Sequence, residues 1–172
     1  MTYRYVKPML ALLLALGVGL AFAVSPAATA PLVLDWQVIG KGVVGGTCSP
    51  TVFSGCTATG SGDALGTHIG NSTYTFSVTT GPTGIADSSG GLCFAADGAG
   101  AVTAANGDVI NFKTVGWLCE EGASGTAFHY NGTYRNVPGT GRFTSVVGGG
   151  NLASTFGRGS VNFIKIDGTI NF

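Results

Sequence analysis

Thr73-Tyr74-Thr75-Phe76-Ser77-Val78-Thr79 is the stretch that decides the fold class, because large apolar side chains alternate in it with small hydroxyl side chains. A period of two places the apolar residues on one face of an extended strand and the hydroxyl residues on the other. The same period recurs in three further sets: Ile110 and Phe112; Phe128, Tyr130 and Tyr134; Ile164, Ile166, Ile170 and Phe172. These patterns predict β-strands with one buried face.

Helical periodicity is absent after residue 30, and short apolar runs are separated by turn-forming residues. Asn106-Gly107-Asp108 is a strong tight-turn signal. Further turn or bulge candidates are Gly81-Pro82, Asp97-Gly98, Pro138-Gly139 and Asp167-Gly168. The runs between them predict about eight strands, near residues 32–40, 64–80, 92–96, 101–105, 108–117, 125–135, 142–147 and 152–172. The last run is long enough to be two strands, or one strand with a bulge. We therefore predict an all-β fold, a single antiparallel β-barrel of about eight strands, with a sandwich as the alternative.

Residues 1–30 have the features of a secretory signal peptide. Arg4 and Lys7 precede an uncharged apolar run, and small residues follow it. Cleavage is expected after Ala23, Ala27 or Ala30, and an uncleaved membrane anchor is the alternative that the short run disfavours. The sequence thus predicts export to the periplasm or the exterior, with residues 31–172 forming one domain.

Four cysteines, Cys48, Cys56, Cys93 and Cys119, all lie in the exported part. An even number in an oxidising compartment favours two disulfides. Three pairings are possible, and we favour Cys48–Cys56 with Cys93–Cys119 because each joins nearest neighbours in sequence. The spacing contains no C-x-x-C pair and no ligand-like histidine spacing, so neither a metal site nor a cofactor is predicted.

Charged side chains make up only 9% of the chain, and the formal net charge is zero. Removing Arg4 and Lys7 with the signal peptide leaves six basic and eight acidic residues, which are scattered. Without a basic stripe, neither nucleic acid nor an anionic membrane is expected as a partner. The many glycines are expected at sharp bends and close strand approaches.

His68 is the most interesting candidate for chemistry, since Asp63 is near enough in sequence to orient its ring. In a pocket mouth it could donate or accept a proton. The interpretation we favour is a hydrogen bond to the backbone where a strand begins, because no partner at fixed spacing supports catalysis.

His129 and Arg135 share one face of a predicted strand, opposite the aromatic face that includes Tyr130. We expect the aromatic face inside, which leaves His129 solvated; the reverse arrangement would let His129 and Arg135 bind a carboxylate. The adjacent Glu120 and Glu121 point to opposite faces of a strand, so we interpret them as a solvated turn. Arg142 is expected to pair with a carboxylate.

Three short motifs carry a family resemblance: Gly66-Thr67-His68-Ile69-Gly70, Thr103-Ala104-Ala105-Asn106-Gly107-Asp108 and Gly139-Thr140-Gly141-Arg142-Phe143. In this order and spacing the chain resembles small secreted bacterial proteins with an allene oxide cyclase-like barrel, to which plant dirigent proteins are more distantly similar in fold. The resemblance covers about residues 60–172. It implies an eight-stranded antiparallel barrel with a cavity for a small, largely apolar molecule, which in characterised relatives is steered through a cyclisation or held in one orientation.

Three function classes follow. In the first, the barrel binds a small apolar ligand inside. The candidate ligand-binding residues are His68, Tyr74, Phe76, Phe112, Trp117, Phe128 and Tyr130, with Trp36 also lining the cavity. Any catalysis would then be of a cyclase or isomerase type, with no catalytic residue assigned. In the second, a packed barrel contacts proteins or glycans through a Thr- and Asn-rich exterior with exposed aromatic residues. In the third, the alternating C-terminus belongs to an eight-stranded outer-membrane barrel.

Overall fold

The structure is a computed structural model that describes residues 32–48, 53–121, 127–157 and 161–171; the predicted signal peptide and Phe172 lie outside this part. Its eight strands are β1 (Val33–Gly46), β2 (Thr57–Gly66), β3 (Gly70–Ala86), β4 (Leu92–Ala104), β5 (Val109–Glu120), β6 (Ala127–Val137), β7 (Val147–Gly157) and β8 (Val161–Asn171). A short 3-10 helix, η1 (Gly141–Phe143), precedes β7. The described residues contain no helix that is long and apolar enough to cross a membrane.

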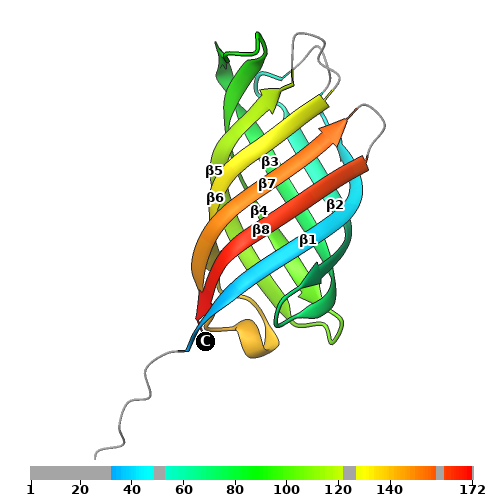
Figure 1. The fold of residues 1–172 in the computed structure, drawn as a ribbon, viewed down its shortest axis with the longest axis vertical. Helices are drawn as coiled ribbons and strands as arrows, with labels where there is room; N and C mark the ends of the chain where they lie inside the picture. Colours follow the sequence, from blue (N-terminus) through cyan, green and yellow to red (C-terminus); the bar gives the residue numbers. More distant parts are fainter. Residues whose placement is uncertain (1–31, 49–52, 122–126, 158–160, 172) are drawn as a thin grey trace, which may run out of the picture. The chain divides into compact units, whose positions relative to one another are not determined.

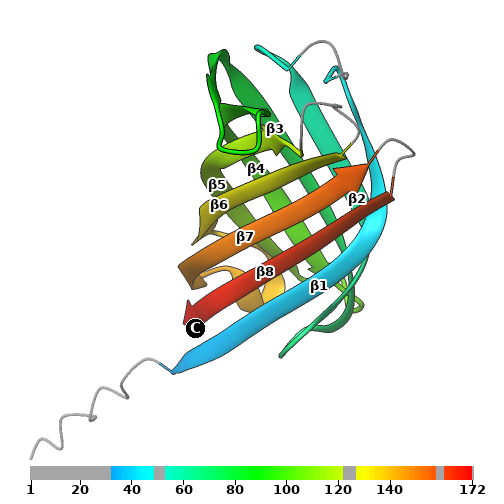
Figure 2. The same cartoon turned by 45° about the horizontal axis from the view of Figure 1, so that its top comes forward.

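The strands form a closed antiparallel barrel in which each strand pairs with the next and β8 pairs with β1 (Figure 1). The strands are staggered. Successive partners, followed around the barrel from Trp36 through Gly168 and Tyr134, return to β1 at Gly46, which is 46 − 36 = 10 residues further along. Such a stagger tilts the strands against the barrel axis, as Figure 2 shows. Eight strands leave an interior that side chains can fill or that holds one small ligand.

The all-β barrel is confirmed, but several predicted segments are wrong. The predicted strand 64–80 is two strands, β2 and β3, and most of β2 was missed. The predicted strands 92–96 and 101–105 are one strand, β4, which runs through Asp97-Gly98 without a turn. The segment 142–147 is mostly η1 and a turn, and 152–172 covers the end of β7 and β8. At Gly81-Pro82 the β3–β4 register shifts, as expected of a bulge.

β2 was missed because its inward face carries no large side chain. Its inward positions are Ala58, Gly60, Gly62, Ala64 and Gly66. The rings of neighbouring strands occupy the space that this face leaves: a Cβ at Gly60 would lie 2.2 Å from the Phe76 ring. The strand therefore has no apolar periodicity of its own and is held by its partners on β1 and β3.

Aromatic side chains pack the interior. The Trp36 and Phe112 rings both meet the Tyr134 ring edge-on, with centroids 5.7 and 6.0 Å away. Tyr74 lies stacked beside Phe76. Burial of these side chains from water is the main favourable contribution to folding.

Phe53, from the β1–β2 connection, is buried and belongs to the core. Its ring centroid lies 4.4 Å from that of Phe128. The Thr80 hydroxyl donates to the Phe53 carbonyl and accepts from the Cys56 N–H, which holds this connection in place.

Both disulfides lie near the same end, and they have the pairing that the sequence favoured. Cys48 is bonded to Cys56, and Cys93 is bonded to Cys119 directly opposite it on β5. Two such bonds indicate that the protein folds in an oxidising compartment.

The opposite end is closed by the turns that contain the three motifs. Arg142 donates from Nη2 to the His68 carbonyl at 3.2 Å, and its Nε lies 3.6 Å from Asp108 Oδ2. The Val109 N–H donates to the Thr140 hydroxyl, and the fully buried Phe143 ring fills the end of the interior. The contacts of Arg142 and Thr140 thus join the three motifs and hold this end of the barrel closed, and we call this set of contacts the latch. Arg142 pairs with a carboxylate, as expected.

Candidate functional site

The structure does not bring the seven predicted ligand-binding residues into one site. Five of them point into the barrel and are buried: Tyr74, Phe76, Phe112, Phe128 and Tyr130. Trp117 lies on the outer face of β5, and His68 lies in the β2–β3 turn at the latched end. Trp36 is 1% exposed and belongs to the packed core.

His68 has the structural surroundings that the sequence favoured. Its backbone lies in the left-handed region, with φ 65°, as the turn requires. Its Nε2 lies 3.1 Å from the Asp35 carbonyl oxygen, and its own carbonyl accepts from Arg142. These contacts tie the turn to β1 and to η1.

The aromatic face of β6 is inside, as predicted, and its polar face is outside. His129 Nδ1 lies 3.5 Å from Glu121 Oε1 at the rim. Glu120 accepts a hydrogen bond from the Leu92 N–H. The side chains of Glu120 and Glu121 therefore have different partners.

The packed interior contains several polar groups. Tyr130 and Thr114 share a hydrogen bond of 2.8 Å, and Ser154 donates to Asn162. The Tyr134 hydroxyl has no hydrogen-bond partner among the described residues. Burial raises the pKa of Tyr134 far above its ordinary value, with a further contribution from the charge of Asp167.

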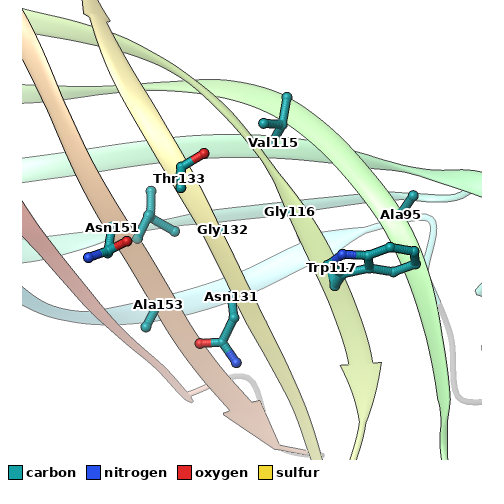
Figure 3. A pocket seen from close by; sticks show the side chains of 10 residues that line it. Ala95, Val115, Gly116, Trp117, Asn131, Gly132, Thr133, Asn151 and Ala153 are labelled. Atoms are coloured by element: carbon teal, nitrogen blue, oxygen red, sulfur yellow. The ribbon is translucent and has the colours of Figure 1, made fainter. Parts of the chain in front are cut away.

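An open groove crosses the outer faces of β4, β5, β6 and β7, and Figure 3 shows it. We call it the β4–β7 groove; its volume is about 670 Å³. It is lined by Ala95, Val115, Gly116, Trp117, Asn131, Gly132, Thr133, Asn151, Leu152 and Ala153. None of these side chains carries a charge.

Trp117 is the largest side chain in the groove, and 44% of it is exposed. The strand register sets it between Ala95 on β4 and Asn131 on β6, and Asn131 is in turn opposite Ala153 on β7. Its ring extends from β5 towards the small side chain of Ala95 (Figure 3). The indole therefore has room to present a flat apolar surface to a ligand.

Polar side chains accompany the indole. Asn131 and Thr133 project from β6 and Asn151 from β7, and none of the three makes a side-chain hydrogen bond to another described residue. Each amide can both donate and accept, and so can the hydroxyl. The groove thus combines an aromatic surface with unused hydrogen-bonding groups.

The prediction that Trp117 lines the interior is wrong, and the alternation along β5 carries the opposite signal. Steps of two from the inward Phe112 lead to Thr114, Gly116 and Leu118, which leaves Trp117 on the outer face. The groove itself combines residues of four strands, and no local pattern links them.

The described residues contain no group of three or more His, Cys, Asp or Glu side chains that could hold a metal ion. Comparisons with protein-family models and with curated protein sequences find no match to this chain.

Proposed function

We propose that this chain is an exported binding module whose packed interior serves as a rigid core and whose ligand binds in the β4–β7 groove. The observation that carries the proposal is the half-exposed Trp117 beside the unpaired side chains of Asn131 and Asn151. Exposed aromatic residues with nearby hydrogen-bonding groups are common at binding surfaces.

The positions of the charged side chains support the proposal that the outer face of the barrel is in contact with water. Lys41, Asp63 and Lys113 project outward from the strands, while the interior is mainly apolar. An outer-membrane barrel has the reverse arrangement, with an apolar band facing lipid. Recovery of the protein only in detergent-extracted membranes would favour the outer-membrane alternative.

Export is part of the proposal. Its support is the signal-like segment at residues 1–30 together with the two disulfides. Mass spectrometry of the protein secreted by a bacterial host tests it, because cleavage gives a shorter chain that begins near residues 24–31.

The binding site can be tested without knowing the ligand. A library of soluble fragments and saccharides would be screened by ¹H–¹⁵N correlation NMR, in which Trp117 and Trp36 give the only two indole signals. We expect shifts at the Trp117 indole and at residues 131–133 and 151–153, with Trp36 unchanged. Shifts confined to inward residues such as Tyr74, or no response to any compound, would contradict the proposal.

A small, largely apolar molecule inside the barrel is the second candidate function. One observation favours it: Trp36 Nε1 and the hydroxyls of Tyr74 and Tyr134 are buried with no hydrogen-bond partner among the described residues. An acceptor oxygen on a ligand could accept hydrogen bonds from these groups. Native and denaturing mass spectra recorded side by side would show whether the protein carries such a ligand, since a co-purified ligand adds mass only in the native spectrum.

We also propose that this chain is related to the allene oxide cyclase-like barrels. Its support is the gathering of all three motifs at one end of the barrel, where they have a joint structural role. A crystal structure of such a bacterial protein in which the arginine of its Gly-Thr-Gly-Arg-Phe motif contacted no neighbouring turn would count against this kinship.

A further inference from the structure

We propose that the ligand is an uncharged oligosaccharide that runs across the strands, with one sugar ring stacked on Trp117 and another on Phe163. This inference rests on the proposed function and adds the chemical class and the direction of the ligand.

A second depression continues the β4–β7 groove around the barrel. It has a volume of about 200 Å³ and is lined by Ile39, Ala153, Ser154, Thr155, Phe163, Ile164 and Lys165. Ala153 belongs to both depressions. Phe163, which is 52% exposed, lies in this second depression, so each depression contains one exposed aromatic ring.

The spacing of the two rings requires a chain rather than a single sugar. Trp117 is on β5 and Phe163 is on β8, so three strand spacings of about 4.8 Å each lie between their backbones along the curved wall of the barrel. A single pyranose ring is too short to reach both. The register leads from Trp117 through Asn131 and Ala153 to Lys165, two residues from Phe163, so a chain that crosses the strands diagonally can reach both rings.

The side chains of the groove match the two kinds of surface that a pyranose presents. The C–H face of the sugar is apolar and flat, which suits the exposed indole of Trp117. The hydroxyl groups around its rim both donate and accept hydrogen bonds. Asn131, Thr133 and Asn151 offer amide and hydroxyl groups that do the same and that have no partner among the described residues.

The lining of these two depressions favours a neutral ligand. The β4–β7 groove has no charged lining residue, and the one in the second depression, Lys165, already pairs with Asp167 at 3.2 Å. A nucleic acid or an acidic polysaccharide needs cations that can release its counterions. An apolar protein surface would instead bury the amides of Asn131 and Asn151 without partners, which is unfavourable.

The test uses the full chain, exported by a bacterial host and purified from the soluble fraction. Neutral oligosaccharides of one to six units, from α-glucan, β-glucan and N-acetylglucosamine series, would be titrated by calorimetry. We expect binding in at least one series, with affinity that rises at least about tenfold from the monosaccharide to the hexasaccharide. Because no ion pair forms, raising the salt to about 1 M should change the affinity less than about twofold.

Three variants test how much each contact contributes to binding. Trp117→Ala should weaken the binding of ligands of every length by about tenfold or more, as expected for an aromatic anchor that the ligand covers. Phe163→Ala should leave the shortest ligands unaffected and remove the gain in affinity with length. Leu65→Ala, which removes an exposed apolar side chain outside both depressions, is the matched control and should change nothing. The buried Trp36 reports by its fluorescence that Trp117→Ala still folds.

Three results would overturn the inference: no binding in any series, binding that survives Trp117→Ala, or binding of acidic polysaccharides alone. A dimer that dissociates when Trp117 is replaced would assign the surface to a second copy and would also overturn it. If the NMR screen finds other compounds at the Trp117 indole while no sugar binds, only this inference fails. If neither experiment finds a ligand there, the proposed function fails too.

Discussion

Arg142 donates a hydrogen bond to the backbone carbonyl of His68 across 3.2 Å, although 74 residues separate them in the sequence. The same guanidinium lies 3.6 Å from Asp108 and stacks over the Phe143 ring. One side chain therefore joins three turns, and these turns contain the motifs on which the family resemblance depends. These contacts give the motifs a role in closing the barrel.

Arg142→Ala should reduce the free energy of unfolding by about 1 kcal/mol, because the charged hydrogen bond is lost while the exposed ion pair contributes little. Urea denaturation followed by fluorescence measures this change. Lys113→Ala removes an exposed cation from the outer face and is the control, for which we expect a change below about 0.5 kcal/mol. Equal effects of the two substitutions would contradict the latch.

The glycine at the centre of the groove is required by a close approach of two strands. A Cβ at Gly116 would lie 2.2 Å from the Asn131 carbonyl oxygen and 2.5 Å from the Gly132 Cα. Gly116→Ala should therefore cost about 1–3 kcal/mol of stability, since the backbone must shift.

Gly45→Ala provides the matched comparison for this substitution. A Cβ there meets only the Thr59 hydroxyl, at 3.4 Å, and the change should be neutral or stabilising by a few tenths of a kcal/mol, about 0.4 at most. Thermal unfolding of both variants checks the pair. The close approach would be contradicted if Gly116→Ala were as stable as Gly45→Ala.

The two disulfides should stabilise the barrel to different extents. Cys48 and Cys56 are 8 residues apart, whereas Cys93 and Cys119 are 26 apart. In the chain-entropy account, the longer loop restricts the unfolded chain more, and the expected contributions are about 2.5 and about 3.5 kcal/mol. Paired Cys→Ala variants, compared by denaturant unfolding, measure both, and a larger loss for the Cys48–Cys56 pair would contradict this order.

Tyr74, Tyr130 and Tyr134 are the only tyrosines in residues 31–172, and burial raises the pKa of each above its ordinary value of 10.0. The hydrogen bond between Tyr130 and Thr114 partly offsets this effect at Tyr130. Since the folded state disfavours tyrosinate, these groups contribute full stability below about pH 10 and progressively less as the pH rises further.

The tyrosinate absorbance of residues 31–172 should therefore appear together with alkaline unfolding rather than at pH 10. Protein unfolded in denaturant is the control, and it should titrate at about 10. A folded protein that shows tyrosinate absorbance with a midpoint near 10 would show that at least one of the three rings is exposed to water.

The sequence is misleading where residue types and local conformation disagree. Asp97-Gly98 has the composition of a turn but continues β4, because Asp97 faces water and Gly98 faces inward where the β3 backbone approaches closely. A Cβ at Gly98 would lie 2.0 Å from the Ser77 carbonyl oxygen. The glycine is thus explained by a neighbour that is 98 − 77 = 21 residues away, which a local pattern cannot show.

The sequence by itself determined the strands that alternate, from Tyr74, Phe76 and Val78 to Ile164 and Ile166, because the period of two is a local property of extended backbone. Only the tertiary structure decided the position of β2, whose inward glycines and alanines accommodate rings from other strands. It also decided the closure of β1 on β8 and the groove around Trp117. These features depend on the register between strands, and hydrogen bonds between distant segments set that register.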